Sequence, residues 1–95
     1  MRLYLIKLDP VDYDTYDAAV IACESRQKLE TLLEKGEFAR ETPDGSYKLN
    51  SGRVQYDYDF YIDRWQKVSE ISAVGYTDLE TDKEAVVILS SFNAG

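Results

Sequence analysis

Aspartate and tyrosine alternate in two short tracts of this chain, and these residues are its first candidates for chemistry. The tracts cover residues 12–17 and 56–63 and hold six of the ten aspartates. Carboxylates that lie close together can act as a general acid and a general base, or can bind calcium. Tyrosine beside them offers a large amphipathic surface to a partner. The candidate site residues are Asp12, Tyr13, Asp14, Tyr16, Asp17, Asp57, Asp59, Tyr61 and Asp63.

The spacing of the aspartates in the first tract can be compared with that of a calcium-binding loop. An EF-hand loop requires the pattern D-x-D-x-D-G with a glutamate at its twelfth position, and it lies between two helices. Here Asp17 is displaced from the third ligand position, no glycine follows, and the flanking segments have strand patterns. We therefore expect no metal and no cofactor, and a weak calcium-binding module is kept as an alternative.

The spacing of two aspartates in the second tract would permit catalysis by an acid pair. Asp57 and Asp59, on alternate positions of a strand, would lie about 6.6–7 Å apart, within the range used by glycoside hydrolases. Any two acids at this spacing would satisfy that range. The chain has no histidine, the usual base for serine or cysteine nucleophiles. Cys23 lies in an apolar run and is predicted to be a buried hydrophobic residue. We expect no enzymatic activity.

Protein binding suits the two tracts better. The chain carries 18 acidic and 11 basic residues, a formal net charge of −7. This charge repels nucleic-acid phosphates and anionic membranes and attracts basic surfaces. The partner is therefore predicted to be a protein with a basic surface, with no direct nucleic-acid or membrane binding. Because Asp57 and Asp59 are spaced like neighbouring phosphates, the second tract could imitate a nucleic acid.

A structural role is the alternative for the same residues. Tyr56, Tyr58 and Phe60 could be core residues, with the aspartates on their solvent side. The chain would then be a structural or adaptor domain whose acids serve solubility. Trp65, just after the second tract, is predicted to be a core anchor.

Length and composition predict one domain, residues 1–95. No apolar stretch approaches the length of a membrane span, and the first residues are not expected to form a signal peptide. A single cysteine fits a reducing, cytoplasmic setting. The oligomeric state is left open.

The expected elements are an antiparallel sheet of four to five strands packed against one helix, an α+β fold. In the strand at 2–8, Leu3 and Leu5 point to one face and Tyr4 and Ile6 to the other, so this strand is expected to be central. The helix is expected to begin after Ser25 and to end near Gly36. Strands are expected at 2–8, 18–23, 68–74 and 84–90, the first two forming a hairpin around an acidic turn at 9–17.

A further strand is expected to begin at Arg53. Strict alternation predicts Tyr56, Tyr58 and Phe60 on a buried face, with Asp57, Asp59, Tyr61 and Asp63 on an exposed one. Phe92 is expected to pack onto the core. Residues 37–53 carry turn signals and no clear element.

Two segments carry a recurring pattern: Tyr13-Asp14-Thr15-Tyr16-Asp17-Ala18, and the closing Ser91-Phe92-Asn93-Ala94-Gly95. This pattern resembles a set of small phage and prophage accessory proteins in which "GYDEYD" and a terminal "SFNAG" recur. The likeness covers residues 2–25 and 65–95, with Asp12 in place of glycine and Thr15 in place of glutamate. The set has no assigned activity, so no catalytic residues carry over. The resemblance implies a phage-encoded protein in the host cytosol that binds and inhibits a host defence complex, as anti-CRISPR proteins and DNA mimics do.

Overall fold

An antiparallel hairpin forms the centre of the sheet, as the strand patterns at 2–8 and 18–23 predict. The computed structural model describes residues 1–40, 52–55 and 60–94. In it β1 (Arg2–Asp9) pairs antiparallel with β2 (Thr15–Cys23), and the register places Leu5 opposite Val20. The hairpin prediction is confirmed, and the turn between the strands is shorter than expected.

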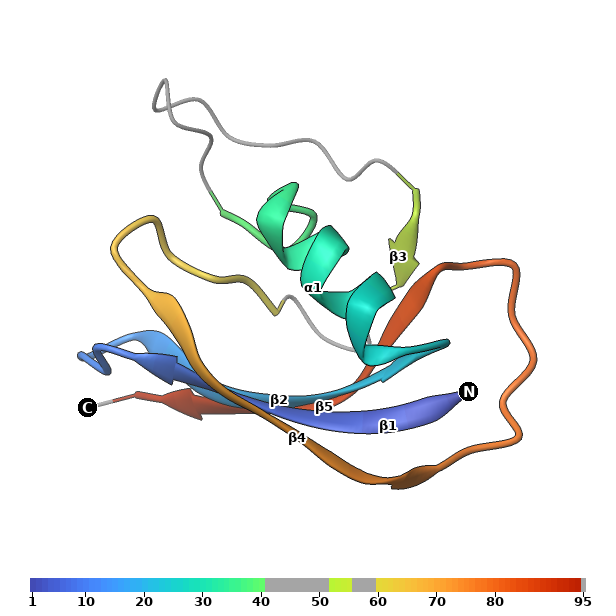
Figure 1. Cartoon of the computed structure of the whole chain (residues 1–95). Coiled ribbons are helices and arrows are strands. Elements are labelled where there is room, and N and C mark those ends of the chain that lie inside the picture. Colours follow the sequence, from blue (N-terminus) through green and yellow to red (C-terminus); the bar gives the residue numbers. More distant parts are fainter. Residues whose placement is uncertain (41–51, 56–59, 95) are drawn as a thin grey trace.

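Two more long strands flank this hairpin. β4 (Lys67–Tyr76) pairs with β1, and β5 (Ala85–Asn93) pairs with β2, both antiparallel. The two-residue β3 (Val54–Gln55) adds to β5 in parallel, so the sheet order is β3-β5-β2-β1-β4 (Figure 1). The α+β prediction is confirmed, and β1 is central.

The helix α1 (Arg26–Glu34) begins and ends where the sequence predicts. The side chain of Ser25 accepts a hydrogen bond from the backbone N–H of Lys28, which satisfies one of the free donors of the first turn. Gly36, just past the last turn, has a φ of 70°, a backbone conformation that glycine adopts without a Cβ clash. The backbone N–H of Gly36 donates to the carbonyl of Leu33 and closes the helix.

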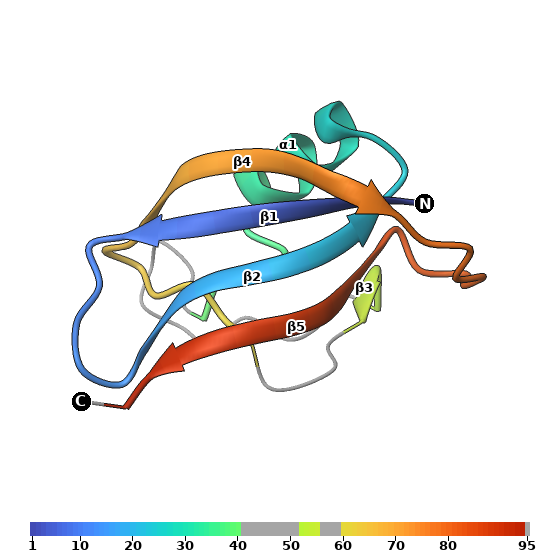
Figure 2. The same cartoon turned by 90° about the horizontal axis from the view of Figure 1, so that it is seen from below.

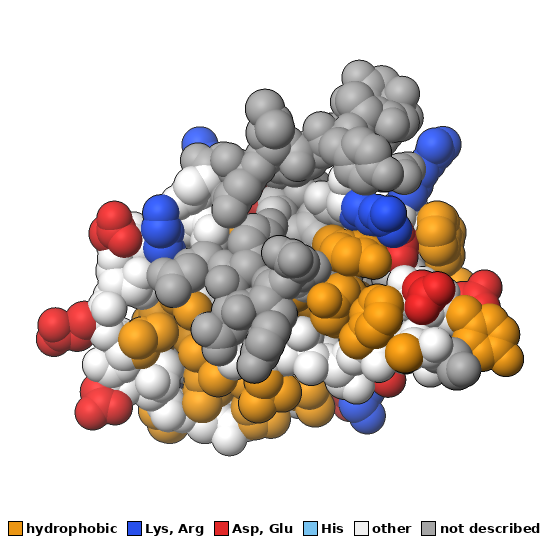
Figure 3. All heavy atoms as spheres, turned by 180° about the vertical axis from the view of Figure 1, so that it is seen from behind, with side chains coloured by type: hydrophobic (Ala, Val, Ile, Leu, Met, Phe, Trp, Pro, Cys, Tyr) orange, Lys and Arg blue, Asp and Glu red, His pale blue; other side chains and the backbone are white. Residues whose placement is uncertain are grey.

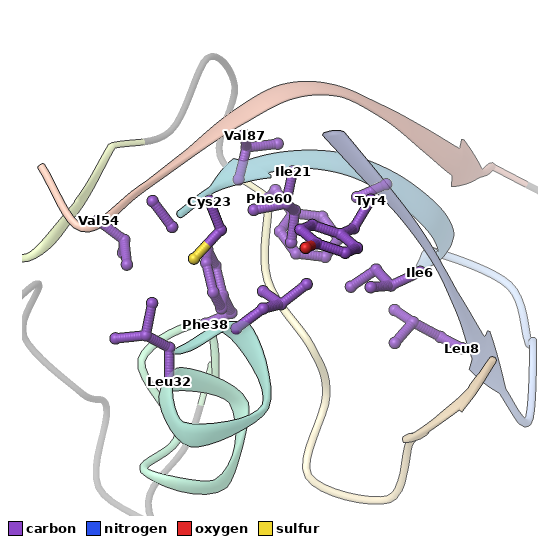
Figure 4. Packing of buried hydrophobic residues seen from close by; sticks show 13 residues of the cluster. Tyr4, Ile6, Leu8, Ile21, Cys23, Leu32, Phe38, Val54, Phe60 and Val87 are labelled. Atoms are coloured by element: carbon purple, nitrogen blue, oxygen red, sulfur yellow. The ribbon is translucent and has the colours of Figure 1, made fainter. Parts of the chain in front are cut away.

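The hydrophobic core lies between α1 and one face of the sheet. Alternate strand residues such as Ile6, Ile21 and Val87 are fully buried against Leu29 and Leu32 of the helix. Phe38 and Phe60 complete this layer (Figure 4). Seen from below, the strands lie in front and α1 behind them, so the helix covers only one face (Figure 2).

The prediction of one long strand from Arg53 to Asp63 is wrong for the described residues of this range. β3 ends at Gln55, and Ile62 makes only an isolated parallel bridge with Ala39. Phe60 is buried as predicted, and Asp63, three residues later, is buried as well. Burial at this spacing is incompatible with a two-residue period, because it places Phe60 and Asp63 on opposite sides of a strand.

Among the described residues, no helix is long and apolar enough to cross a membrane.

Candidate interaction surface

The acidic turn between β1 and β2 is exposed and internally hydrogen-bonded. The side chain of Asp12 accepts from the N–H of Tyr13 at 2.7 Å, and the hydroxyl of Thr15 donates to the carbonyl of Asp12 at 2.7 Å. Asp14 has a φ of 58°, in the left-handed region that aspartate and asparagine tolerate. Its N–H donates to the carbonyl of Asn93 at 2.7 Å. The turn therefore presents Asp12 and Asp14 in a fixed geometry at the end of the sheet.

Tyr13 and Val11 are the large exposed hydrophobic residues of this turn. The side chain of Tyr13 is 73% exposed and that of Val11 46% exposed. Tyr13 is thus placed where the sequence analysis expected a binding residue, with carboxylates on both sides. We call residues 10–14 the acidic turn.

Tyr16 joins the two aspartate–tyrosine tracts. Its ring lies 5.1 Å from the centroid of Phe60 and 5.1 Å from that of Tyr61, both edge to face, and 4.8 Å from that of Phe92. Such pairs contribute about 0.5–1.5 kcal/mol each beyond the area they bury. Phe92 was predicted to pack onto the core; it contacts Tyr16 but is 44% exposed and lies outside the core cluster, so it is not a core residue. Tyr16 is consequently a packing residue, and it holds Phe60 and Tyr61 of the second tract near the end of the sheet that carries the acidic turn.

The exposed position predicted for Asp63 is wrong. Its side chain is only 3% exposed, and one carboxylate oxygen lies 3.5 Å from the guanidinium of Arg40. Arg40 also lies over the ring of Tyr61, 4.9 Å from the centroid. Tyr61 is half-buried between Arg40 and Tyr16. Neither Asp63 nor Tyr61 presents the open acidic face that alternation predicted.

Gln66 holds the segment before β4 against the acidic turn. Its side-chain amide donates to the carbonyls of Pro10 at 3.1 Å and Tyr16 at 2.8 Å. Its side-chain oxygen accepts from the N–H of Asp63 at 3.0 Å. One buried amide therefore ties residues 63–66 to both ends of the turn region.

Asp17 occupies an irregular position in β2. Its neighbour Tyr16 pairs with Phe92 and its neighbour Ala18 pairs with Ser91. Asp17 itself has no paired residue on β5, because the register shifts at this point. The residue is half-buried, and one of its carboxylate oxygens is buried without a hydrogen-bond partner among the described residues. The aspartates Asp57 and Asp59, with Tyr56 and Tyr58, lie outside the described residues.

A second group of acids lies at the opposite end of the sheet. Asp78, Glu80 and Asp82 are exposed in the connection from β4 to β5, and Glu24 is exposed after β2. Figure 3 shows Asp and Glu side chains towards both lateral ends of the molecule, with hydrophobic side chains along the lower margin between them. In the described part of the chain, these two groups of acids lie at opposite ends of the sheet.

Cys23 is buried, as predicted. Its thiol donates to the carbonyl of Glu84 at 3.4 Å, and burial raises the pKa of the thiol. A raised pKa lowers the thiolate fraction, the reactive form. Among the described residues, which include Asp12, Asp14 and Asp17, no three acidic or thiol side chains gather closely enough to hold a metal ion.

Trp65 is exposed, and its predicted role as a core anchor is wrong. Trp65 is 56% exposed and lies in the turn that the N–H of Gln66 closes on the carbonyl of Asp63. No sequence signal separates this tryptophan from a buried one.

Comparisons with protein-family models, with curated proteins and with solved structures found no match for this chain. The likeness to phage accessory proteins stays a prediction from the sequence pattern.

Proposed function

We propose that this protein is a non-enzymatic, acidic interaction domain of phage or mobile-element origin. It docks on a basic, nucleic-acid-binding surface of a host defence complex and inhibits that complex. The observation that carries the proposal is the acidic turn, where Asp12 and Asp14 flank the exposed Tyr13.

The rigidity of the acidic turn favours binding. Its hydrogen bonds to Thr15 and Asn93 fix the backbone before a partner arrives, so less conformational entropy is lost on association. Two exposed carboxylates steer the approach of a basic surface, and Tyr13 supplies contact area with few rotatable bonds. Exposed carboxylates and an exposed tyrosine do not form an active site by themselves, and the only thiol of the chain is buried.

The test compares two neutralised variants of equal net charge. D12N/D14N removes two carboxylates from the acidic turn, and asparagine preserves both the side-chain acceptor of Asp12 and the left-handed backbone of Asp14. D78N/D82N removes two carboxylates from the opposite end of the sheet. Each variant changes the formal net charge of −7 by two units.

Both variants and the unmodified protein are used to capture partners from a host lysate at low and at high salt. We expect a basic protein to be retained at low salt and released at high salt, because salt screens exposed charges. D12N/D14N should lose this partner and D78N/D82N should keep it. Equal loss with both variants would contradict a site at the acidic turn. Capture of no basic protein would favour the structural or adaptor role.

A further inference from the structure

The face of the sheet opposite α1 is unusually apolar for an antiparallel sheet with one helix. Directly paired residues of neighbouring strands share a face, so the register defines three rows that cross β4, β1, β2 and β5. The rows are Gly75, Leu3, Ala22 and Val86; Ser72, Leu5, Val20 and Leu89; and Glu70, Lys7, Ala18 and Ser91. None of these residues belongs to the core cluster around α1, and we call them the open face.

In the first two rows of the open face, the aliphatic side chains of Leu3, Leu5, Val20 and Leu89 are partly exposed, at positions that are normally polar, and Ala22 and Val86 are buried. Leu5 and Val20 are opposite each other and only half-buried, and Leu89 next to them is 53% exposed. Antiparallel sheets that face water on one side usually alternate apolar and polar residues. No described segment crosses this face (Figure 2). A contiguous apolar surface of this kind marks an interaction site.

The charge of the open face argues against a basic partner on this side of the sheet. The only ionisable side chains in the three rows are those of Lys7 and Glu70, and these form an ion pair at 3.3 Å. The face is therefore neutral, although the chain carries a net charge of −7. A basic partner would find no surplus of acids here, whereas a second neutral, aliphatic face would be complementary.

We propose that the open face is a self-association surface, on which a second copy of this chain packs sheet against sheet. In a two-fold arrangement the aliphatic rows of one copy lie on those of the other, and Lys7 and Glu70 can pair across the interface as well as within a copy. Stacked sheets pack about 10 Å apart, with interdigitated side chains.

The size of the open face sets the strength of the dimer. Four strands spaced by about 4.8 Å and three rows spaced by about 6.8 Å give an upper limit of roughly 400 Å² per copy. The exposed apolar part is smaller, because Ala22 and Val86 are buried and the third row is mostly polar. This is below the roughly 800 Å² per partner of a standard stable interface. The dimer is consequently weak and depends on protein concentration.

Salt affects the dimer and the proposed docking in opposite directions. The acids at the two ends of the sheet repel those of a second copy, and salt screens this repulsion. The dimer should strengthen as salt rises, while binding of a basic partner at the acidic turn should weaken. The self-association proposal does not depend on the proposed function, and either can fail alone.

The test is the molar mass in solution, measured by sedimentation and light scattering up to on the order of 1 mM protein. We expect the mass to rise from 10.9 kDa towards twice that value with concentration, and at lower concentration when salt is added. L89K should weaken association at least tenfold. The control L79K places the same charge at a 40% exposed leucine in the β4–β5 connection and should leave association unchanged.

The choice of lysine excludes increased charge repulsion as the cause of weaker association. Each substitution reduces the net negative charge, so it lowers the long-range repulsion between copies, and a weaker dimer must come from the face itself. S91K, at an exposed position of the third row, provides a second variant whose folding does not depend on an apolar side chain. A constant mass of 10.9 kDa at all concentrations, or equal weakening by L79K and L89K, would overturn the proposal.

Discussion

The two faces of the sheet carry similar aliphatic side chains and differ in what covers them. On one face Ile6 and Ile21 are fully buried beneath α1. On the other, Leu5 and Val20 are only half-buried. The residues alternate along the same two strands, so hydrophobicity alone does not decide which face becomes the core. The position of the helix decides it, and the uncovered face keeps apolar area for association.

Replacing Ile21 by alanine should have the largest effect on folding stability. It removes buried methyl and methylene groups from the layer beneath α1 and leaves a cavity, which costs about 2–5 kcal/mol. The neighbouring V20A, on the open face, should cost about 1 kcal/mol or less in dilute solution. Urea unfolding of both variants measures the difference, and equal losses would show that the two faces are not distinct.

Removal of the helix cap should have an intermediate effect. Ser25→Ala removes the acceptor for the N–H of Lys28 and should destabilise the protein by about 1 kcal/mol. The control Gln27→Ala, at an exposed position of the same helix, should change stability by less than about 0.5 kcal/mol. Thermal unfolding compares the two, and an equally large loss with Gln27→Ala would argue against the cap.

The ion pair that joins α1 to the start of β5 should give the smallest effect, and one that depends on pH. The Lys28 ammonium lies 2.6 Å from a carboxylate oxygen of Glu84, and this hydrogen bond lowers the pKa of Glu84 below its usual 4.5. The unfolded chain therefore binds more protons near that pH, and the stabilisation is present above pH 4.5 and lost as pH falls through the lowered pKa.

The same contact acts at the alkaline end through Lys28. Its hydrogen bond to Glu84 raises the pKa of the ammonium above 10.5, so the stabilisation is present below that value and disappears as pH rises through the raised pKa. Melting temperatures of E84Q and the unmodified protein should differ at neutral pH and converge at acidic pH. A difference that persists in acid would assign the effect to packing.

Local signals were sufficient for most of the fold. Alternation predicted the strands at 2–8 and 68–74, and continuous apolar runs predicted those at 18–23 and 84–90. Ser25 and Gly36 predicted the ends of the helix, because a capping signal acts within a few residues. The assignment of β1 as central also followed from apolar groups on both of its faces. No local signal predicted the short parallel pairing of β3 with β5.

The candidate site was predicted less well, because long-range contacts decide it. Asp63 is buried by its pairing with Arg40, and Tyr16 meets Tyr61 across 45 positions of the chain. Neither contact has a local sequence signature. The turn between the first two strands, by contrast, was predicted at residues 9–17, and the structure places it at 10–14, where it is exposed.

The amide of Gln66 has a consequence for the dynamics of the molecule. Because it bonds to Pro10, Tyr16 and Asp63 at once, the acidic turn and the segment before β4 cannot open independently without breaking a buried hydrogen bond. The two segments form one cooperative unit in the sense of native-state hydrogen exchange. The backbone amides of Asp63 and Asp14 should therefore lose their protection from hydrogen exchange at the same denaturant concentration, although the two residues lie far apart in the sequence.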